Sequence, residues 1–106
     1  MTTLQKIMTE FKQLMVQIYG DQLKQVLLYG SYARGENTSD SDIDLAVILK
    51  TDRLERWREV ERIAPVVVDL SSKYDCPLSP IVLEEDRLNT SQNLFIRNVR
   101  QEGISL

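Results

Sequence analysis

Two short groups of residues in the first half of the chain are of types that could do phosphate chemistry. Gly30-Ser31 ends one apolar run, and Asp42-Ile43-Asp44 opens a second apolar run ten residues later. A glycine lets the backbone approach a ligand closely, and Ser31 can start a helical turn whose free N–H groups suit an anion. One or two carboxylates together with substrate phosphates are the usual ligands of Mg²⁺. The spacing therefore points to a site for a magnesium-bound nucleoside triphosphate.

The two aspartates stand at the start of a strand-like segment that runs from Asp44 to Leu49. Strand side chains alternate between faces, so Asp42 and Asp44 should point the same way and Ile43 the other way. Neighbouring carboxylates repel each other, and a divalent cation would remove that repulsion. A Gly-Ser turn or an Asp-x-Asp strand edge is commonplace when it occurs alone. The two together, bracketed by apolar strands, indicate a nucleotide site.

Arg34 is the only cation in the loop between the two motifs. Its planar guanidinium suits a triphosphate or a phosphate-bearing transition state. We favour that role because Arg34 lies four residues after Gly30, in the segment that faces the aspartates. The alternative is that Arg34 caps the short turn or pairs with a surface carboxylate.

The string GSYARGENTSDSDIDLAVIL, which carries both motifs, resembles the signature of the DNA polymerase beta nucleotidyltransferase superfamily, and most of all its minimal, MNT-type branch. The resemblance is specific over residues 26–49 and looser over residues 50–106. It implies a nucleotidyltransferase fold and nucleotidyl transfer, in which an acceptor hydroxyl attacks the α-phosphorus of a nucleoside triphosphate and pyrophosphate leaves.

The same resemblance assigns roles to four residues. It implies that Asp42 and Asp44 hold Mg²⁺ and act in catalysis, and we expect Arg34, from its position in the loop, to act with them. Gly30 and Ser31 would bind the β- and γ-phosphates of ATP. Two metal ions stabilise the attacking and leaving oxygens in enzymes of this kind.

Members of the superfamily often add a third carboxylate from the next strand, and here the sequence departs from that pattern. The aligned position in Leu78–Leu83 is Ser79. Asp75, just before this strand, or Asp69, in the preceding segment, could substitute, although both read more simply as surface groups. Because general-base assistance contributes roughly 10²–10⁴-fold, its loss predicts a slow enzyme.

Minimal transferases of this branch are commonly antitoxins of HEPN-domain ribonuclease toxins, and they are thought to adenylylate a toxin tyrosine. The resemblance therefore implies an antitoxin that transfers AMP from ATP to a HEPN toxin. Two alternatives stay open: a binding antitoxin without catalysis, which the serine at position 79 would favour, and a transferase for a small-molecule acceptor. An unrelated scaffold with incidental aspartates is a third reading.

Length and composition narrow the class of protein. The chain has 106 residues, of which 42% are hydrophobic and 27% charged, and this length and composition predict one globular domain over residues 1–106. The net charge of −3 gives no reason to expect direct nucleic-acid binding. We expect a cytoplasmic protein, because the sequence has a single cysteine, no apolar stretch that could cross a membrane and no signal peptide. The absence of histidine removes imidazole bases and His-ligated zinc.

The periodicity of apolar residues predicts the elements that must position the site. An amphipathic helix spans residues 4–18, capped by Thr2 and ended by Gly20, and strands follow at 25–29, 44–49 and 78–83. Pro80 marks the last strand as an edge strand. The expected class is α/β (α+β), with a small mixed sheet of about three strands and helices packed on it.

The second half of the chain predicts further helices. From residue 51, Leu54, Trp57, Val60 and Ala64 line one helical face, which places Trp57 in the core. A proline at position 65 should kink this helix or open the next one. Residues 66–74 read as helical, although their β-branched start could also form a strand. Acidic residues at 84–86 begin a last helix that ends at Gly103, and the tail after it folds back.

Overall fold

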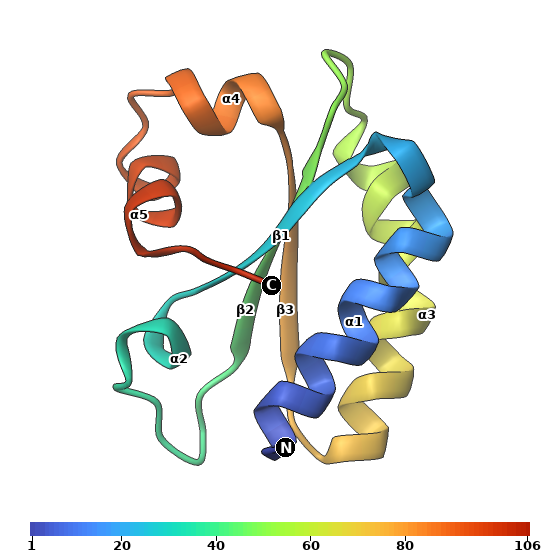
Figure 1. Ribbon diagram of the computed structural model, residues 1–106, viewed down its shortest axis with the longest axis vertical. Helices are drawn as coiled ribbons and strands as arrows, with labels where there is room; N and C mark the ends of the chain where they lie inside the picture. Colours follow the sequence, from blue (N-terminus) through green and yellow to red (C-terminus); the bar gives the residue numbers. More distant parts are fainter.

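The computed structural model describes residues 1–106 and consists of a four-stranded mixed sheet with helices on both faces (Figure 1). The predicted α/β (α+β) class is confirmed. In chain order, the elements are α1 (Thr3–Tyr19), a 3-10 turn (Gly20–Gln22), β1 (Leu23–Tyr29), α2 (Ser31–Arg34), β2 (Ile43–Leu49), α3 (Arg56–Tyr74), β3 (Leu78–Glu84), α4 (Glu85–Thr90), α5 (Leu94–Glu102) and β4 (Ile104–Ser105).

The strand order in the sheet is β3-β2-β1-β4. β1 runs antiparallel to both β2 and β4, and β2 runs parallel to β3. β3 is an edge strand, as Pro80 predicted. The tail folds back as predicted and adds β4, in which Ile104 pairs with Leu28, as a fourth strand beyond the three expected.

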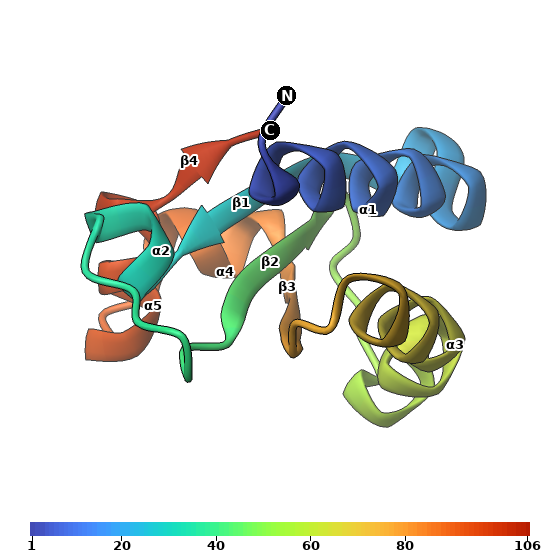
Figure 2. The ribbon, with the colours of Figure 1, turned by 90° about the horizontal axis from the view of Figure 1, so that it is seen from below.

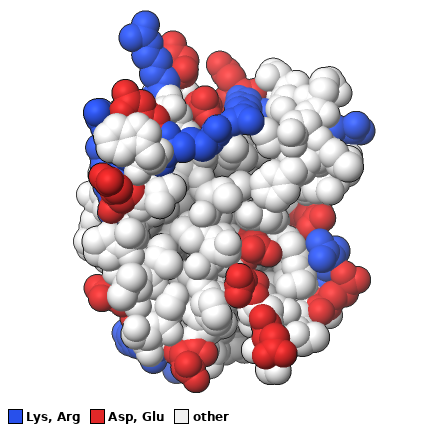
Figure 3. Space-filling view, turned by 180° about the vertical axis from the view of Figure 1, so that it is seen from behind, with Lys and Arg blue, Asp and Glu red and all other residues white.

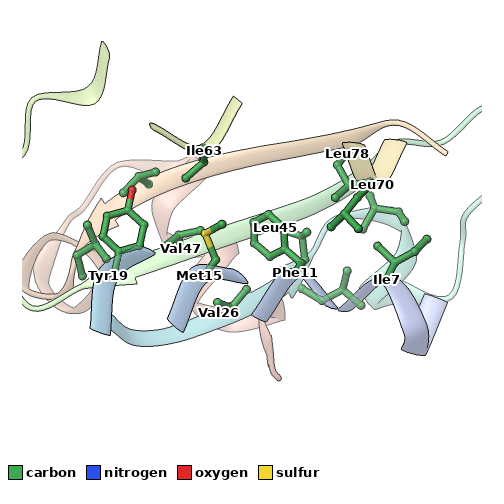
Figure 4. Packing of buried hydrophobic residues seen from close by; sticks show 14 residues of the cluster. Ile7, Phe11, Met15, Tyr19, Val26, Leu45, Val47, Ile63, Leu70 and Leu78 are labelled. Atoms are coloured by element: carbon green, nitrogen blue, oxygen red, sulfur yellow. The ribbon is translucent and has the colours of Figure 1, made fainter. Parts of the chain in front are cut away.

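The helices form two layers around the sheet, α1 and α3 on one face and α4 and α5 on the other (Figures 1 and 2). Alternation along β2 divides its side chains between the two layers. Leu45 and Val47 belong to the core under α1 and α3, where Phe11 and Met15 pack (Figure 4), whereas Ala46 and Ile48 belong to the core under α4 and α5. The strand that begins beside the aspartates is therefore held rigidly from both sides.

Helix α1 begins and ends as the sequence predicts. The Thr2 hydroxyl accepts the Gln5 N–H (3.1 Å) and the Gln5 side chain accepts the Thr2 N–H (2.8 Å), which completes the capping box. Gly20, at φ +53°, closes the helix. None of the helices in the chain combines the length and the apolarity that a membrane span requires.

Helix α3 differs from the prediction in its start and in the face it buries. It begins at Arg56 and runs without interruption past Pro65 to Tyr74, so the helical reading of residues 66–74 is confirmed. Its buried residues are Glu59, Ile63 and Leu70, while Trp57 is 61% exposed. The prediction that Trp57 is a core residue was wrong. The prediction took Leu54 as the first residue of the buried helical face. Leu54 does pack against the core, but it precedes the helix and therefore does not determine which side of α3 is buried.

Helices α4 and α5 replace the single helix predicted from residue 84 to Gly103. They are separated at Ser91, where α4 ends, and Asn93, whose side chain accepts the Ile96 N–H (3.2 Å) and caps α5. An N-terminal cap of this kind is a sequence signal for a new helix. The predicted end at Gly103 is confirmed.

Candidate active site

Asp44 lies on β2 between two neighbouring strands, paired with Tyr29 of β1 and Ser79 of β3. Because Leu45 faces α1 and α3, the side chain of Asp44 faces the opposite layer, which holds α5. Asp42, two residues earlier and exposed, has the same parity. The Asp42 charge acts on the Asp44 carboxyl, which is consistent with the prediction that the two side chains point the same way.

Gly30, at the end of β1, is in direct contact with Asp44. A Cβ atom added to Gly30 would lie 2.2 Å from Asp44 Oδ2, closer than any real contact. The backbone of Gly30 also has φ +76° and ψ −154°, a conformation that is essentially restricted to glycine. Both the closeness of Asp44 and the backbone conformation therefore require glycine at position 30. The turn and the carboxylate, which were predicted from separate motifs, lie together at one corner of the sheet.

The single helical turn α2 follows this corner. Its first ladder bond runs from the Arg34 N–H to the Gly30 carbonyl (3.1 Å), and the turn ends at Gly35, at φ +71°. Ser31 is its first residue, so the Ser31 N–H lies before the first ladder bond, where helical N–H groups have no intrahelical acceptor. The assignment of Gly30 and Ser31 to ATP phosphates remains a prediction.

Arg34 is engaged in ion pairs. Its Nε donates to Glu36 Oε1 (2.6 Å) and its Nη1 donates to Glu102 Oε2 (3.0 Å) and Oε1 (3.2 Å), while nearly half of the side chain stays exposed. Pairing with surface carboxylates was the alternative reading of this residue. A role on phosphate, which would require these pairs to rearrange, remains a prediction.

Glu102, the last residue of α5, is the part of the site that sequence reasoning missed. Its carboxylate accepts the Gly30 N–H (3.2 Å) in addition to the Arg34 guanidinium, and three-quarters of its side chain is buried. The C-terminal helix thus reaches across to the corner at the end of β1. The sequence carries one weak signal for it, an acidic residue directly before Gly103 and the tail that folds back.

The charges around Asp44 are mostly negative. Burial raises the pKa of Asp44 above its ordinary value, the charges of Asp42 and Glu102 raise it further, and Arg34 opposes them. Burial, and then the charge of Asp44, raise the pKa of Tyr29 to about 12. Two ionised aspartates are costly at this place unless a cation accompanies them.

A third carboxylate does not complete the pair. Ser79 pairs with Asp44 in register, at the position where the resemblance to the superfamily predicts a third carboxylate. Asp69 lies on α3, which covers the opposite face of the sheet, and Asp75 is exposed at the C-terminal end of that helix. The chain contains no group of three or more acidic or cysteine side chains that could hold a metal ion. The donor set of Asp42 and Asp44 fits a Mg²⁺ ion whose remaining ligands are phosphate and water oxygens.

Comparison with protein families gives one match that covers most of the chain. Residues 8–96 match the family model described as nucleotidyltransferase domain. Among curated relatives from Methanocaldococcus jannaschii, the candidate protein adenylyltransferase MJ0141 is 33% identical over 95% of this chain and 96% of its own length. The candidate protein adenylyltransferase MJ0604 is 32% identical over 93% of each.

Solved structures share the fold. One is a mutant of the toxin–antitoxin MntA–HpeT, with a TM-score of 0.61 and 24% identity over 92% of this chain and 69% of that chain. Another is a toxin–antitoxin with AMP-PNP, with a TM-score of 0.56 and 21% identity over 91% of this chain and 69% of that chain. At these identities the similarity establishes a common architecture.

Proposed function

Because the chain belongs to the nucleotidyltransferase domain family, we propose that it transfers AMP from ATP to a hydroxyl group of a partner protein. The family match spans residues 8–96, so the resemblance to nucleotidyltransferases found at residues 26–49 is confirmed. The two Methanocaldococcus jannaschii relatives, which are named for protein adenylylation and align with nearly the whole chain, support a protein as the acceptor.

The contact between Gly30 and Asp44 is the observation that carries this proposal. It brings the turn proposed to meet phosphates within reach of the carboxylates proposed to hold metal. In the proposed site, Gly30 and Ser31 bind the β- and γ-phosphates of ATP. Asp42 and Asp44 hold Mg²⁺, which when bound would neutralise phosphate charge and stabilise the leaving pyrophosphate.

The proposed reaction is a displacement at the α-phosphorus. The acceptor oxygen forms a bond to this atom, and the bond between it and the pyrophosphate oxygen breaks. The hydroxyl proton passes to water, since Ser79 occupies the position at which a carboxylate base was expected. A reaction without such a base is slower by roughly 10²–10⁴-fold. A slow rate is sufficient for a modification that is made once per partner molecule.

We infer that the partner is a HEPN ribonuclease toxin and that the acceptor is a tyrosine, as the resemblance to the MNT-type branch implies. The toxin–antitoxin structures that share the fold make such a toxin the first protein to test. A second candidate function, neutralisation of the toxin by binding alone, is favoured by the serine at position 79 and by the absence of a three-carboxylate group.

One experiment separates these functions. The chain is purified together with the protein encoded by the neighbouring gene, incubated with ATP and Mg²⁺, and both proteins are weighed by mass spectrometry. We expect the partner to gain the mass of one or more AMP groups, and a variant with Asp42→Asn and Asp44→Asn to leave it unmodified. A partner that is neutralised without any gain in mass would establish the binding function instead.

A further inference from the structure

Helix α3 exposes the apolar stripe that the sequence suggested would be buried. Trp57, Val60 and Val68 are 61%, 55% and 62% exposed, and Ala64 between them is also exposed. Their spacing of three and four residues places them on one side of the helix. Because the core stripe of α3 is a different one, these side chains form a second apolar face that nothing in the chain covers.

This face adjoins a groove that follows the edge strand β3. Val60 lines it from α3, Pro80 and Ile81 from β3, and Phe95 and Ile96 from α5, around a cavity of about 320 Å³. A second hollow of about 200 Å³ adjoins it at the first two of these residues and continues along α3. Five of the eight large hydrophobic side chains that the protein exposes belong to α3 and α5, the two helices that flank the groove. Such clustering marks an interaction site.

The groove begins next to the candidate active site. Ile81 lies two residues after Ser79 on β3 and therefore on the face that carries Asp44. From the other wall, the ring of Phe95 packs edge-on against Tyr29 at 5.8 Å between centroids, and Tyr29 is the β1 partner of Asp44. A molecule seated in the groove thus lies within one or two side chains of the carboxylates.

The edge of β3 determines what kind of segment the groove can hold. The Ile43 N–H donates to the Pro77 carbonyl (2.9 Å), and in a parallel ladder alternate residues turn their backbone groups to the neighbouring strand. Leu78, Pro80 and Val82 therefore turn their backbone groups away from β2, toward the groove.

These outward positions offer little to an added strand. The Leu78 N–H already donates to the Ser71 hydroxyl (3.2 Å), and Pro80 has no N–H. Val82 is left as the one donor of the three. A helix satisfies its own backbone and needs only an apolar groove, so the geometry suits a helix better than a strand.

Charge distinguishes the two ends of this surface. Arg56 and Arg87 line the groove, and Arg87 takes part in no ion pair, whereas Arg56 reaches Glu84 at 3.6 Å. Seen from the side of β3 and α3, the molecule shows a broad uncharged surface. At one end of it Lys and Arg stand among Asp and Glu, and at the other end the charged side chains are mostly Asp and Glu (Figure 3). Acidic residues of a partner would be attracted to Arg56 and Arg87 and repelled at the mostly acidic end.

We propose that this groove docks the acceptor protein through an amphipathic helix, whose apolar face covers Val60, Pro80 and Phe95 and whose acidic residues meet Arg56 and Arg87. The inference rests on the proposed function, because it takes the occupant to be the protein that is modified. When the acidic residues of the partner helix meet Arg56 and Arg87, the orientation of that helix is fixed and the partner protein lies alongside Asp44.

Two variants and a matched control test the proposal with the protein encoded by the neighbouring gene as the probe. Val60→Glu places a charge in the apolar part of the groove, and Arg87→Glu reverses the charge of its unpaired cation. Val16→Glu is the control, since Val16 is 49% exposed on α1, a helix that contributes no residue to the groove. We expect the first two changes to raise the Kd for the probe at least tenfold, with the Kd for ATP unchanged and the control binding normally.

The same variants separate the docking from the reaction. Binding is measured without ATP, so weaker binding by Val60→Glu and Arg87→Glu supports the groove even if no AMP is ever transferred. Conversely, transfer with an unaltered KM for the probe in both variants overturns the groove and leaves the proposed function intact. Failure of the unmodified chain to bind the probe overturns the docking as well. A concentration-dependent dimer of the chain that Val60→Glu abolishes would assign the groove to a second copy and also overturn it.

Hydrogen exchange gives a readout that does not depend on a variant folding well. Adding the probe to the unmodified chain should slow amide exchange over residues 57–68 and 80–96, and leave α1 unchanged. Slowed exchange confined to any other part of the surface would contradict the proposal.

Discussion

Replacement of Gly30 by alanine should separate the geometry of the site from the stability of the fold. The added Cβ atom would lie 2.2 Å from Asp44 Oδ2, and ordinary contacts begin at 3.4 Å, so the carboxylate has to withdraw by about 1 Å. A misplacement of that size can cost about 10²-fold in rate. The backbone conformation of Gly30 adds a cost in stability of about 1–3 kcal/mol for a residue with a side chain.

Gly35→Ala is the matched control. Gly35 also has a positive φ, +71°, but a Cβ added there meets nothing within 4 Å. This variant should lose about 1–2 kcal/mol of stability from its left-handed backbone. For a chain of this size each kcal/mol lowers the Tm by about 4 °C. Both variants should therefore melt earlier than the parent, and only Gly30→Ala should displace a carboxylate.

The assay is the initial rate of AMP transfer to the partner protein, measured well below both melting temperatures. We expect Gly30→Ala to be slower by about 10²-fold and Gly35→Ala to stay close to the parent. Equal rates for the two variants would refute the reasoning, because the Gly30–Asp44 contact would then have no part in the reaction. The comparison is made at saturating partner, so that docking does not enter.

Four further predictions concern charge and hydrogen bonding. Mg²⁺ with ATP should raise the Tm of the parent chain but not of the variant with Asp42→Asn and Asp44→Asn, which calorimetry would show. The raised pKa of Asp44 means that the folded protein holds this proton more tightly than the unfolded chain; its contribution to the free energy of unfolding is thus present below about pH 4 and is lost as the pH rises through the raised pKa. Urea denaturation in EDTA between pH 4 and 7 should show that the single change Asp44→Asn removes this decline in the free energy of unfolding. Glu102→Gln weakens the acceptor of the hydrogen bonds from the Gly30 N–H and the Arg34 guanidinium. It should tighten ATP binding about twofold to fivefold in titration calorimetry, because an ion pair whose arginine is nearly half exposed has a small free energy. Tyr19→Phe should cost about 1–3 kcal/mol in urea denaturation, because it removes a hydrogen bond (2.8 Å) to the buried carboxylate of Glu59 and leaves that group only its ion pair with Arg62 (3.3 Å).

The site could be predicted from sequence as far as its parts are local. Alternation along a strand is a short-range property, and it places Asp42 and Asp44 on one face whatever the rest of the chain does. The glycine at position 30 could be assigned to a close approach for the same reason. The atom that it approaches could not be identified, because the contact with Asp44 depends on the register between β1 and β2.

The parts that sequence reasoning missed are set by contacts between distant segments. Glu102 lies 68 residues from Arg34 and 72 from Gly30, and no periodicity links them. Trp57 was misplaced because the start of α3 fixes its helical phase, and the apolar residue before the helix suggested the wrong phase. The break between α4 and α5 had a readable signal in Asn93, which the acidic start and the apolar residues around it obscured.

The balance of charge explains why a metal ion would be the natural partner of the proposed nucleotide site. Arg34 is the only cation that acts on Asp44, and it already faces Glu36 and Glu102. A triphosphate would add several negative charges to a corner where Asp42 already raises the pKa of its neighbour. One arginine cannot offset all of these, so ATP should bind there only together with divalent cations. Without Mg²⁺, ATP binding should be weak and should improve when Asp42 and Asp44 are neutralised, whereas in the presence of Mg²⁺ the same two changes should weaken it.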